Sequence, residues 1–436
     1  MKRTELKGAV VKQLIFLEFN EINFEFIEAY IAQGYLPNFR RLIEAHGYCR
    51  TTSEQAYEEL EPWIQWVSAH TGLTYKEHRA FRLGDAVGKG LDQVWSVLER
   101  QGVRVGALSP MNAENTLSQP AFFVPDPWTK TETSGTHLLK RFTAAVSQAV
   151  NDNASGRLTI RSLWDLLCGA VAYAQPSSYL AYFKILANLP SNGWRKAIFL
   201  DRLLADTFIT LCQKTRPQFA TLFLNAAAHI QHHYLFNSKV YSGNGKNPDW
   251  YIKQGTDPVL EIYQLYDQVI NDVQRKLKGC RLMLATGLRQ IPYERETYYW
   301  RLKNHADFLR LANIDFRAVL PRMSRDFLVE CESAESAAAG ANALSTATID
   351  DQPAFSVDNR SNSLFVTLEY PFEIKANSVC RVRNVEIKEF LSLVAFVAIK
   401  NGRHDSTGYF IDSAAHYADQ VIPLTDLKNR VLTCFV

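Results

Sequence analysis

Apolar residues gather in short runs along the chain, and the segments between these runs have helical spacing. The first run, Val10–Phe19, is mostly apolar and ends at Asn20-Glu21, a pattern typical of a central strand buried on both faces. The residues that follow place Phe24, Ile27 and Ile31 at the spacing of an amphipathic helix. Further strands are predicted at Tyr48–Ser53, Val103–Leu108, Phe219–Leu224, Arg281–Ala285 and Gly408–Ile411. Strands that alternate with helices predict an α/β fold with a mostly parallel central sheet and helices on both faces.

Two segments interrupt this alternation. Residues 131–215 have helical patterns and few strand signals, which predicts a helical insertion between strands of the sheet. Residues 314–375 contain several short strand candidates and predict a small strand-rich insertion. We therefore expect one large α/β domain over residues 1–436, with both insertions inside it.

Composition and charge narrow the class of protein. The 436 residues are 47% hydrophobic and 21% charged, which excludes a disordered chain, a collagen and a coiled-coil rod. The net charge is only +3, so no global field attracts nucleic acid or a membrane, and neither is expected as a partner. No run of eighteen apolar residues predicts a spanning helix, and no signal peptide is predicted at the N-terminus. Seven cysteines are scattered without a CxxC pair, which is typical of reduced thiols and favours a cytoplasmic location.

Several common catalytic motifs are absent from the sequence. It contains no Walker A loop, no GxGxxG after the first strand, no GxSxG and no HExxH, which argues against the enzyme classes that depend on them. Four polar segments instead follow predicted strands, at residues 19–23, 59–72, 224–233 and 401–408. Ligands of open α/β sheets bind at the carboxyl ends of the strands, so we expect the site where these segments meet. The last segment contains Asn401-Gly402, which predicts a turn with His404 near its tip.

The wording and order of four motifs resemble the alkaline phosphatase superfamily, nearest its nucleotide pyrophosphatase/phosphodiesterase branch. The motifs are Leu36-Pro37-Asn38-Phe39-Arg40-Arg41-Leu42 with Gly47, Ser68-Ala69-His70-Thr71-Gly72 with His78, Asn225 with His229, and His404 with Gly408. The resemblance covers most of the chain in order and implies that superfamily's α/β fold. It also implies an enzyme that acts on phosphate or sulfate esters with two metal ions and a hydroxyl or thiol nucleophile.

The chain departs from this pattern at the residues that the chemistry needs. The metal-binding Asp positions of the family fall on Asn20 and Asn225, its paired Asp-His falls near Thr286-Gly287, and its nucleophile falls on Pro62. An Asn carbonyl is neutral and offsets none of the charge of a divalent ion. We therefore expect Asn20, Asn225, His229 and His404 to hold one zinc or manganese ion weakly, or no metal at all.

Other residues of these segments are candidates for catalysis or substrate binding. Glu61 lies at a predicted helix start, within Glu58–His70, where it could act as a base or simply cap the helix. His229 and His404 are the catalytic candidates beside it, and His233 lies four residues after His229 on the same predicted helix face. Packing of aromatic side chains is the alternative interpretation for this histidine-rich segment. The substrate-binding candidates are Glu21, Arg82, Asn112, Asp126 and Trp128.

Two functions follow from these observations. The first is an atypical hydrolase or group transferase that acts on a phosphate- or sulfate-bearing small molecule, in a biosynthetic pathway and without the usual two-metal mechanism. The second is a catalytically inactive relative that binds a ligand or a partner chain. The sequence leaves the substrate and the oligomeric state open, a homo-oligomer included.

Overall fold

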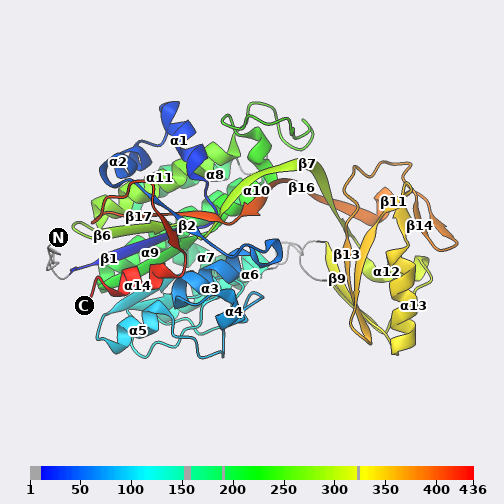
Figure 1. Ribbon diagram of the computed structural model, residues 1–436, viewed down its shortest axis with the longest axis horizontal. Coiled ribbons are helices and arrows are strands. Elements are labelled where there is room, and N and C mark those ends of the chain that lie inside the picture. Colours follow the sequence, from blue (N-terminus) through cyan, green and yellow to red (C-terminus); the bar gives the residue numbers. More distant parts are fainter. Residues whose placement is uncertain (1–10, 152–158, 189–191, 322–324) are drawn as a thin grey trace. The chain divides into compact units, whose positions relative to one another are not determined.

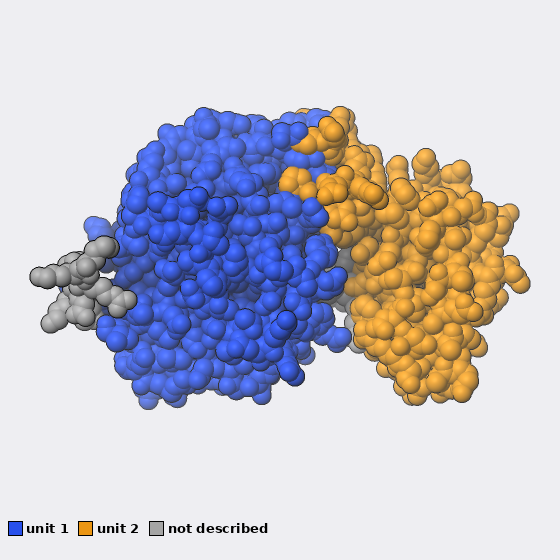
Figure 2. Space-filling view, viewed as in Figure 1, with its two compact units in different colours: residues 1–242, 254–291, 403–436 blue, residues 243–253, 292–402 orange. Residues whose placement is uncertain are grey.

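The computed structural model describes residues 11–151, 159–188, 192–321 and 325–436 (Figure 1). The chain divides into two compact units, each with its own interior. Unit 1 comprises residues 1–242, 254–291 and 403–436, and unit 2 comprises residues 243–253 and 292–402 (Figure 2). No helix in these described ranges is long and apolar enough to cross a membrane.

Unit 1 is built on an eight-stranded sheet of order β18-β2-β17-β6-β1-β5-β3-β4. The central strand β1 (Leu14–Phe19) pairs in parallel with β5 (Phe219–Leu224) and with β6 (Arg281–Ala285). Both β3 (Val105–Leu108) and β4 (Phe122–Val124) continue this parallel order, whereas β17 (Thr407–Asp412) runs antiparallel to β6 and to β2 (Cys49–Thr52). The edge strand β18 is Val421–Pro423. The predicted α/β class with a mostly parallel sheet is therefore confirmed.

Helices cover both faces of the sheet because β1 is apolar on both sides. Phe19 packs edge-on against Phe39 of α2 (Pro37–His46) and at a tilt against Tyr266 of α11 (Pro258–Lys276), with ring centroids 6.4 and 4.4 Å apart. On the other face, Glu18 contacts His70 of α3 (Pro62–Thr71). Figure 1 shows α1 (Phe24–Ala32), α2 and α11 on one side of the sheet, and α3, α5 (Val94–Arg100) and α14 (Asp426–Leu432) on the other.

The start of α3 differs from the prediction. The helix predicted over Glu58–His70 is two elements, a 3-10 turn η1 (Tyr57–Glu59) and α3, with Glu61 as the N-cap. Pro62 occupies the first helical position, where its missing N–H needs no partner and its fixed φ suits the helix. Beyond α3, the short helix α4 spans Tyr75–His78.

The segment between β4 and β5 is helical in its described residues. It contains α6 (His137–Asn151), α7 (Ile160–Tyr173), the 3-10 turn η3 (Pro176–Ser178), α8 (Tyr179–Ala187) and α9 (Arg195–Thr215). An unbroken run of buried residues from 201 to 212 places α9 in the interior of unit 1. After β5, α10 (Ala226–Tyr234) and the turn η5 (Leu235–Asn237) lead towards unit 2.

The described residues of unit 2 form two small antiparallel sheets and two helices, besides the strands that the unit shares with unit 1. One sheet has the order β12-β13-β9-β8 and the other the order β11-β10-β14-β15. Their strands are β8 (Ala318–Pro321), β9 (Asp326–Glu330), β10 (Thr348–Ile349), β11 (Gln352–Pro353), β12 (Phe355–Asn359), β13 (Ser363–Leu368), β14 (Cys380–Val382) and β15 (Val385–Ile387). The helices are α12 (His305–Leu311) and α13 (Ala334–Ser345), and a 3-10 turn η6 covers Phe390–Leu393. This compact unit extends on both sides of residues 314–375, the range predicted as strand-rich.

Two long strands pair with each other and continue from unit 1 into unit 2. They are β7 (Arg289–Leu302) and β16 (Val394–Asp405). The turn predicted at Asn401-Gly402 is wrong, because both residues lie inside β16. His404 therefore extends from a strand, one residue before that strand ends.

Candidate metal site at the carboxyl ends of the central strands

Polar side chains from four segments of unit 1 meet beyond the central strands. Asn20 and Glu21 follow β1, and Asn225 follows β5 as the N-cap of α10. The helix α10 then carries His232, and β16 supplies His404. Segments that follow the strands thus meet in the structure, although the side chains that come together are not all those expected from the sequence.

The backbone of Glu21 is held in a conformation that is uncommon for a residue with a side chain. Its φ is 61°, in the left-handed region. The Glu21 N–H donates to the carbonyl of Thr286 at 3.0 Å, and its carbonyl accepts from the Gln231 side chain at 2.9 Å and from the Gln290 N–H at 3.2 Å. Three bonds to three different segments therefore fix the direction in which the Glu21 carboxylate extends.

Two imidazoles face the Glu21 carboxylate. Glu21 Oε2 lies 3.3 Å from His404 Nε2 and 3.4 Å from His232 Nε2, and the two Nε2 atoms are 3.2 Å apart. Three ligands that share one zinc-sized ion at about 2.1 Å lie about 3.4 Å apart when their arrangement is tetrahedral. The three atoms are therefore spaced as the ligands of a single ion would be.

The electrostatics of this group are dominated by its own members. The Glu21 carboxylate is buried, which by itself raises its pKa, but the neighbouring His404 and His232 outweigh this effect. The result is a pKa of Glu21 well below its usual range. The carboxylate is therefore anionic at neutral pH and available to a cation.

Two amide side chains donate hydrogen bonds to the Glu21 carboxylate. Gln290 Nε2 donates to Glu21 Oε2 at 2.5 Å and to the Ala228 carbonyl at 2.9 Å. Asn20 Nδ2 donates to the other carboxylate oxygen at 3.1 Å. Such outer hydrogen bonds orient ligating carboxylates in metal sites.

The two asparagines at the predicted metal positions bond to protein groups instead. Asn20 Oδ1 accepts from the Trp66 indole N–H at 2.7 Å, and Asn20 Nδ2 donates to Asn225 Oδ1 at 2.7 Å. Each amide oxygen thus already has a donor. Among the described residues, Glu21, His232 and His404 form a group that could hold a metal ion, and the set predicted was Asn20, Asn225, His229 and His404.

The remaining histidines of α10 pair with each other. The rings of His229 and His233 are 4.7 Å apart in an edge-to-face arrangement, as expected for residues four apart on a helix. Removal from solvent, together with the neighbouring His229 and His232, lowers the pKa of His233 well below its ordinary value. Neither His229 nor His233 belongs to the group formed with Glu21.

Glu61 lies on the far side of the His404 ring. Its Oε2 is 3.8 Å from His404 Nδ1, while His404 Nε2 faces Glu21. A carboxylate on the second nitrogen of an imidazole favours the ring orientation and the tautomer that a metal needs. Glu61 is about one third exposed, so it also remains in contact with solvent.

The four other predicted binding residues lie in and around a loop that they help to hold together. Asp126 accepts hydrogen bonds from the backbone N–H groups of Asn112, Trp128 and Thr129. The Asn112 side chain accepts from the Gly84 N–H and donates to the carbonyls of Trp63 and Arg82. Trp128 packs on the core of unit 1, and the Arg82 side chain is exposed. None of these hydrogen bonds is to Glu21, His232 or His404.

Three contributors to the site carried little or no signal in the sequence. His232 could be noted only as one of several histidines on α10, and Trp66 is an ordinary apolar residue of α3. Gln290 lies on β7, a strand that the sequence did not reveal. Their roles depend on contacts between segments far apart in the chain.

Comparison with known proteins gave matches only among solved structures. No protein-family model matches the chain, and no curated protein matches its sequence. The chain is similar to a phosphonoacetate hydrolase from Sinorhizobium meliloti 1021 in complex with phosphonoformate, with 10% identity, 98% of this chain and 97% of that chain covered, and a TM-score of 0.41. It is similar to human ectonucleotide pyrophosphatase/phosphodiesterase 5, with 10% identity, 97% and 94% coverage and a TM-score of 0.43. It is also similar to the alkaline phosphatase PafA, with 10% identity, 98% and 96% coverage and a TM-score of 0.47.

The sequence motifs resemble the alkaline phosphatase superfamily and its nucleotide pyrophosphatase/phosphodiesterase branch, and the names of PafA and of the human protein are those of these two groups. At this identity and these TM-scores, the matches are similarities and carry no residue roles. The chemistry of this chain has to be inferred from its own site.

Proposed function

We propose that this protein is a hydrolase or group transferase that acts on a phosphate- or sulfate-bearing small molecule with the help of one divalent ion. The observation that supports it is the spacing of Glu21 Oε2, His232 Nε2 and His404 Nε2, between 3.2 and 3.4 Å from one another. The sequence resemblance to the alkaline phosphatase superfamily supplies the substrate class. Seven free cysteines are consistent with a cytoplasmic protein, and we assign the reaction to a biosynthetic pathway there.

The residues present fit one ion and do not fit two. An anionic carboxylate and two imidazoles are common ligands of zinc and manganese. A second ion would need further carboxylates, and the places expected for them hold Asn20 and Asn225, bonded to each other. An ion bound at Glu21, His232 and His404 would supply a Lewis acid that polarises a phosphoryl or sulfuryl oxygen.

The other polar residues divide between support and proton transfer. Gln290 and Asn20 keep the Glu21 carboxylate in place, and Trp66 keeps Asn20 in place. Pro62 offers no hydroxyl for a covalent intermediate, so the acceptor is a water molecule or a second substrate. Glu61, partly exposed and next to His404, is the residue that we assign to accept the proton of that acceptor.

The second candidate is a catalytically inactive relative that binds a ligand. Asn20 forms one hydrogen bond with Asn225 and another with the Trp66 indole. These protein groups occupy the place expected for a second ion, which favours the inactive relative. The two candidates differ in turnover, and in the need for a metal.

Metal content and turnover test the proposal together. Protein purified without chelator is expected to contain about one equivalent of zinc or manganese by elemental analysis, and to hydrolyse a p-nitrophenyl phosphate ester, diester or sulfate. Glu21→Gln and His232→Ala each remove a ligand, so we expect at least a tenfold loss of metal affinity by calorimetric titration. His416→Ala is the matched control, because His416 is exposed and bonds only to the Ala45 carbonyl among the described contacts.

The outcomes separate the two candidates. Wild-type protein that neither retains nor binds zinc or manganese would refute the metal-assisted reaction. If the wild-type protein binds one ion but turns over none of the three esters, and Glu61→Gln behaves in the same way, the inactive relative is favoured. Loss of turnover in Glu61→Gln with intact metal binding supports the assigned role of Glu61.

A further inference from the structure

Two helices of the segment between β4 and β5 present large apolar side chains to solvent. Seventeen large apolar residues are exposed among the described residues of the chain, and nine of them lie on α7 and α8. We call these nine the α7–α8 apolar face: Ile160, Leu163, Trp164, Leu167, Val171, Tyr179, Leu180, Phe183 and Leu186. Half of the exposed large apolar residues thus lie on two short helices, a concentration typical of an interaction surface.

The orientation of α7 is the reverse of an ordinary surface helix. Its apolar residues Ile160 to Val171 recur at helical spacing on the side that faces solvent, and Ile160 is 88% exposed. The opposite side buries Ser162, Asp165 and Gly169. Side-chain contacts fix this orientation, because Asp165 pairs with Arg141 and a Cβ at Gly169 would overlap the Phe142 ring.

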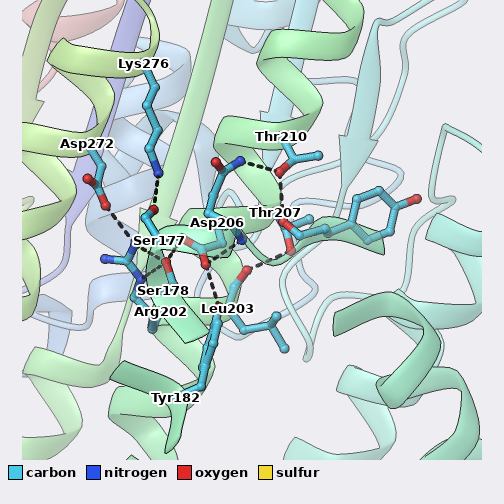
Figure 3. Close-up of polar contacts among 12 residues, drawn as sticks. Ser177, Ser178, Tyr182, Arg202, Leu203, Asp206, Thr207, Thr210, Asp272 and Lys276 are labelled. Carbon is cyan, nitrogen blue, oxygen red and sulfur yellow. Dashed lines mark hydrogen bonds and ion pairs between the residues drawn. The ribbon is translucent and has the colours of Figure 1, made fainter. Parts of the chain in front are cut away.

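A buried polar network holds the connection between the two helices against α9 (Figure 3). Asp206 of α9 accepts hydrogen bonds from the Gln175 N–H at 3.0 Å, from the Ser178 hydroxyl at 3.0 Å and from the Tyr182 hydroxyl at 2.8 Å. Arg202 bridges Asp206 at 2.8 Å and Asp272 of α11 at 2.7 Å. Asp206, Ser178 and the Tyr182 hydroxyl of this network therefore lie in the interior, on the side away from the exposed apolar residues.

The charged residues of α7 and α8 indicate which kind of partner binds the α7–α8 apolar face. Arg161 and Lys184 are exposed, and Asp165, the one carboxylate on α7 and α8, is buried in its ion pair. We propose that the α7–α8 apolar face binds the surface of an anionic lipid bilayer. Basic side chains beside exposed Trp, Tyr, Phe and Leu residues are typical of helices that lie in the membrane interface.

A second copy of the chain fits the face less well. Closed homodimers bring the same surface of both subunits together, so each charge needs a complement on that same surface. Two copies would bring Arg161 and Lys184 together without an exposed carboxylate on α7 or α8. The face departs from the expectation of no membrane partner, which rested on the small net charge and on the lack of a run of eighteen apolar residues. It is also independent of the function proposed for the Glu21 group.

Vesicle flotation of the full-length protein tests the proposal. We expect wild-type protein to float with phosphatidylcholine vesicles that contain one quarter phosphatidylglycerol, and several-fold less with phosphatidylcholine alone or at high salt. Trp164→Glu with Leu167→Glu is expected to weaken flotation at least tenfold. Leu311→Glu with Phe372→Glu changes two exposed apolar residues elsewhere and is expected to leave it unchanged.

The basic residues and the oligomeric state complete the test. Arg161→Gln with Lys184→Gln is expected to remove the preference for phosphatidylglycerol. Absence of flotation in the wild type, or equal flotation of the Trp164/Leu167 variant, would overturn the proposal. A wild-type dimer in light scattering that this variant converts to monomer, with no vesicle binding, would assign the face to a second copy instead.

Discussion

Ser68 of the Ser-x-x-Thr-Gly motif and His78, the histidine that follows the motif, contact each other in the interior of this chain. His78 is buried, its Nδ1 accepts from the Ala80 N–H at 3.0 Å, and its Nε2 lies 3.1 Å from the Ser68 hydroxyl. Because Nδ1 accepts, the proton is on Nε2 and is donated to Ser68. Burial lowers the pKa of His78 from 6.5 to about 4. The motif therefore ties α3 to α4 through a neutral imidazole.

A neutral buried histidine makes stability depend on pH in a defined direction. The folded protein binds a proton at His78 less readily than the unfolded chain, so its contribution is fully present above pH 6.5 and is lost as pH falls through about 4. The full contribution is about 3 kcal/mol. In urea unfolding, the stability advantage of wild type over His78→Gln is expected to shrink between pH 7.5 and pH 4.5. The matched change at exposed His416 serves as the control, and a constant gap for His78→Gln would contradict the argument.

At the scale of elements, the sequence predicts the central apolar strands of the sheet and misses the long strand β7. The strands β1, β3, β5 and β6 are short apolar runs. The bounds of β5 and β6 are those predicted, whereas β3 begins two residues and β1 four residues later than predicted. By contrast, β7 is rich in charged and aromatic residues and has no regular alternation. It is a strand because β16 pairs with it, and that pairing overrides the turn preference of Asn401-Gly402.

The candidate site likewise contains residues that a local pattern singles out and a residue that no local pattern identifies. Glu21 and Asn20 could be singled out because a predicted strand ends there, and Glu61 because a helix begins there. The choice of His232 from among the histidines of α10 depends on where β16 brings His404, 172 residues later in the chain. No local pattern contains that information.

The buried network around Arg202 joins three elements and allows a test of their coupling. Arg202 is 4% exposed, and its pairs with Asp206 and Asp272 connect α9, α11 and the turn η3. Arg202→Met would leave buried Asp206 without its cation, and Asp272 with only Arg275 at 3.9 Å. Removing one partner of a buried pair costs about 3–5 kcal/mol. We expect a corresponding loss in the free energy of unfolding measured with urea. Arg100→Met removes an exposed pair with Asp92 and should change it by less than about 1 kcal/mol.

At the scale of the whole molecule, core clusters of the described residues are each confined to one of the two units. One core cluster contains only residues between Trp300 and Val394, all in unit 2. Another, which includes Trp66, Trp95 and Phe223, lies entirely in unit 1. A unit with its own core is able to unfold as a cooperative whole, so two thermal transitions are expected in calorimetry.

The candidate metal site distinguishes these transitions, because Glu21, His232 and His404 all belong to unit 1. An ion that binds only the folded state stabilises by about 2.7 kcal/mol when its free concentration is a hundred times Kd. For a unit of about 300 residues, that corresponds to an increase in Tm of about 4 °C. Zinc or manganese is therefore expected to shift one transition and leave the other in place. Hydrogen exchange should assign the shifted transition to β1, β5 and β6, and Glu21→Gln should abolish the shift. Equal shifts of both transitions, or a shift that persists in Glu21→Gln, would show that the ion binds elsewhere in the chain.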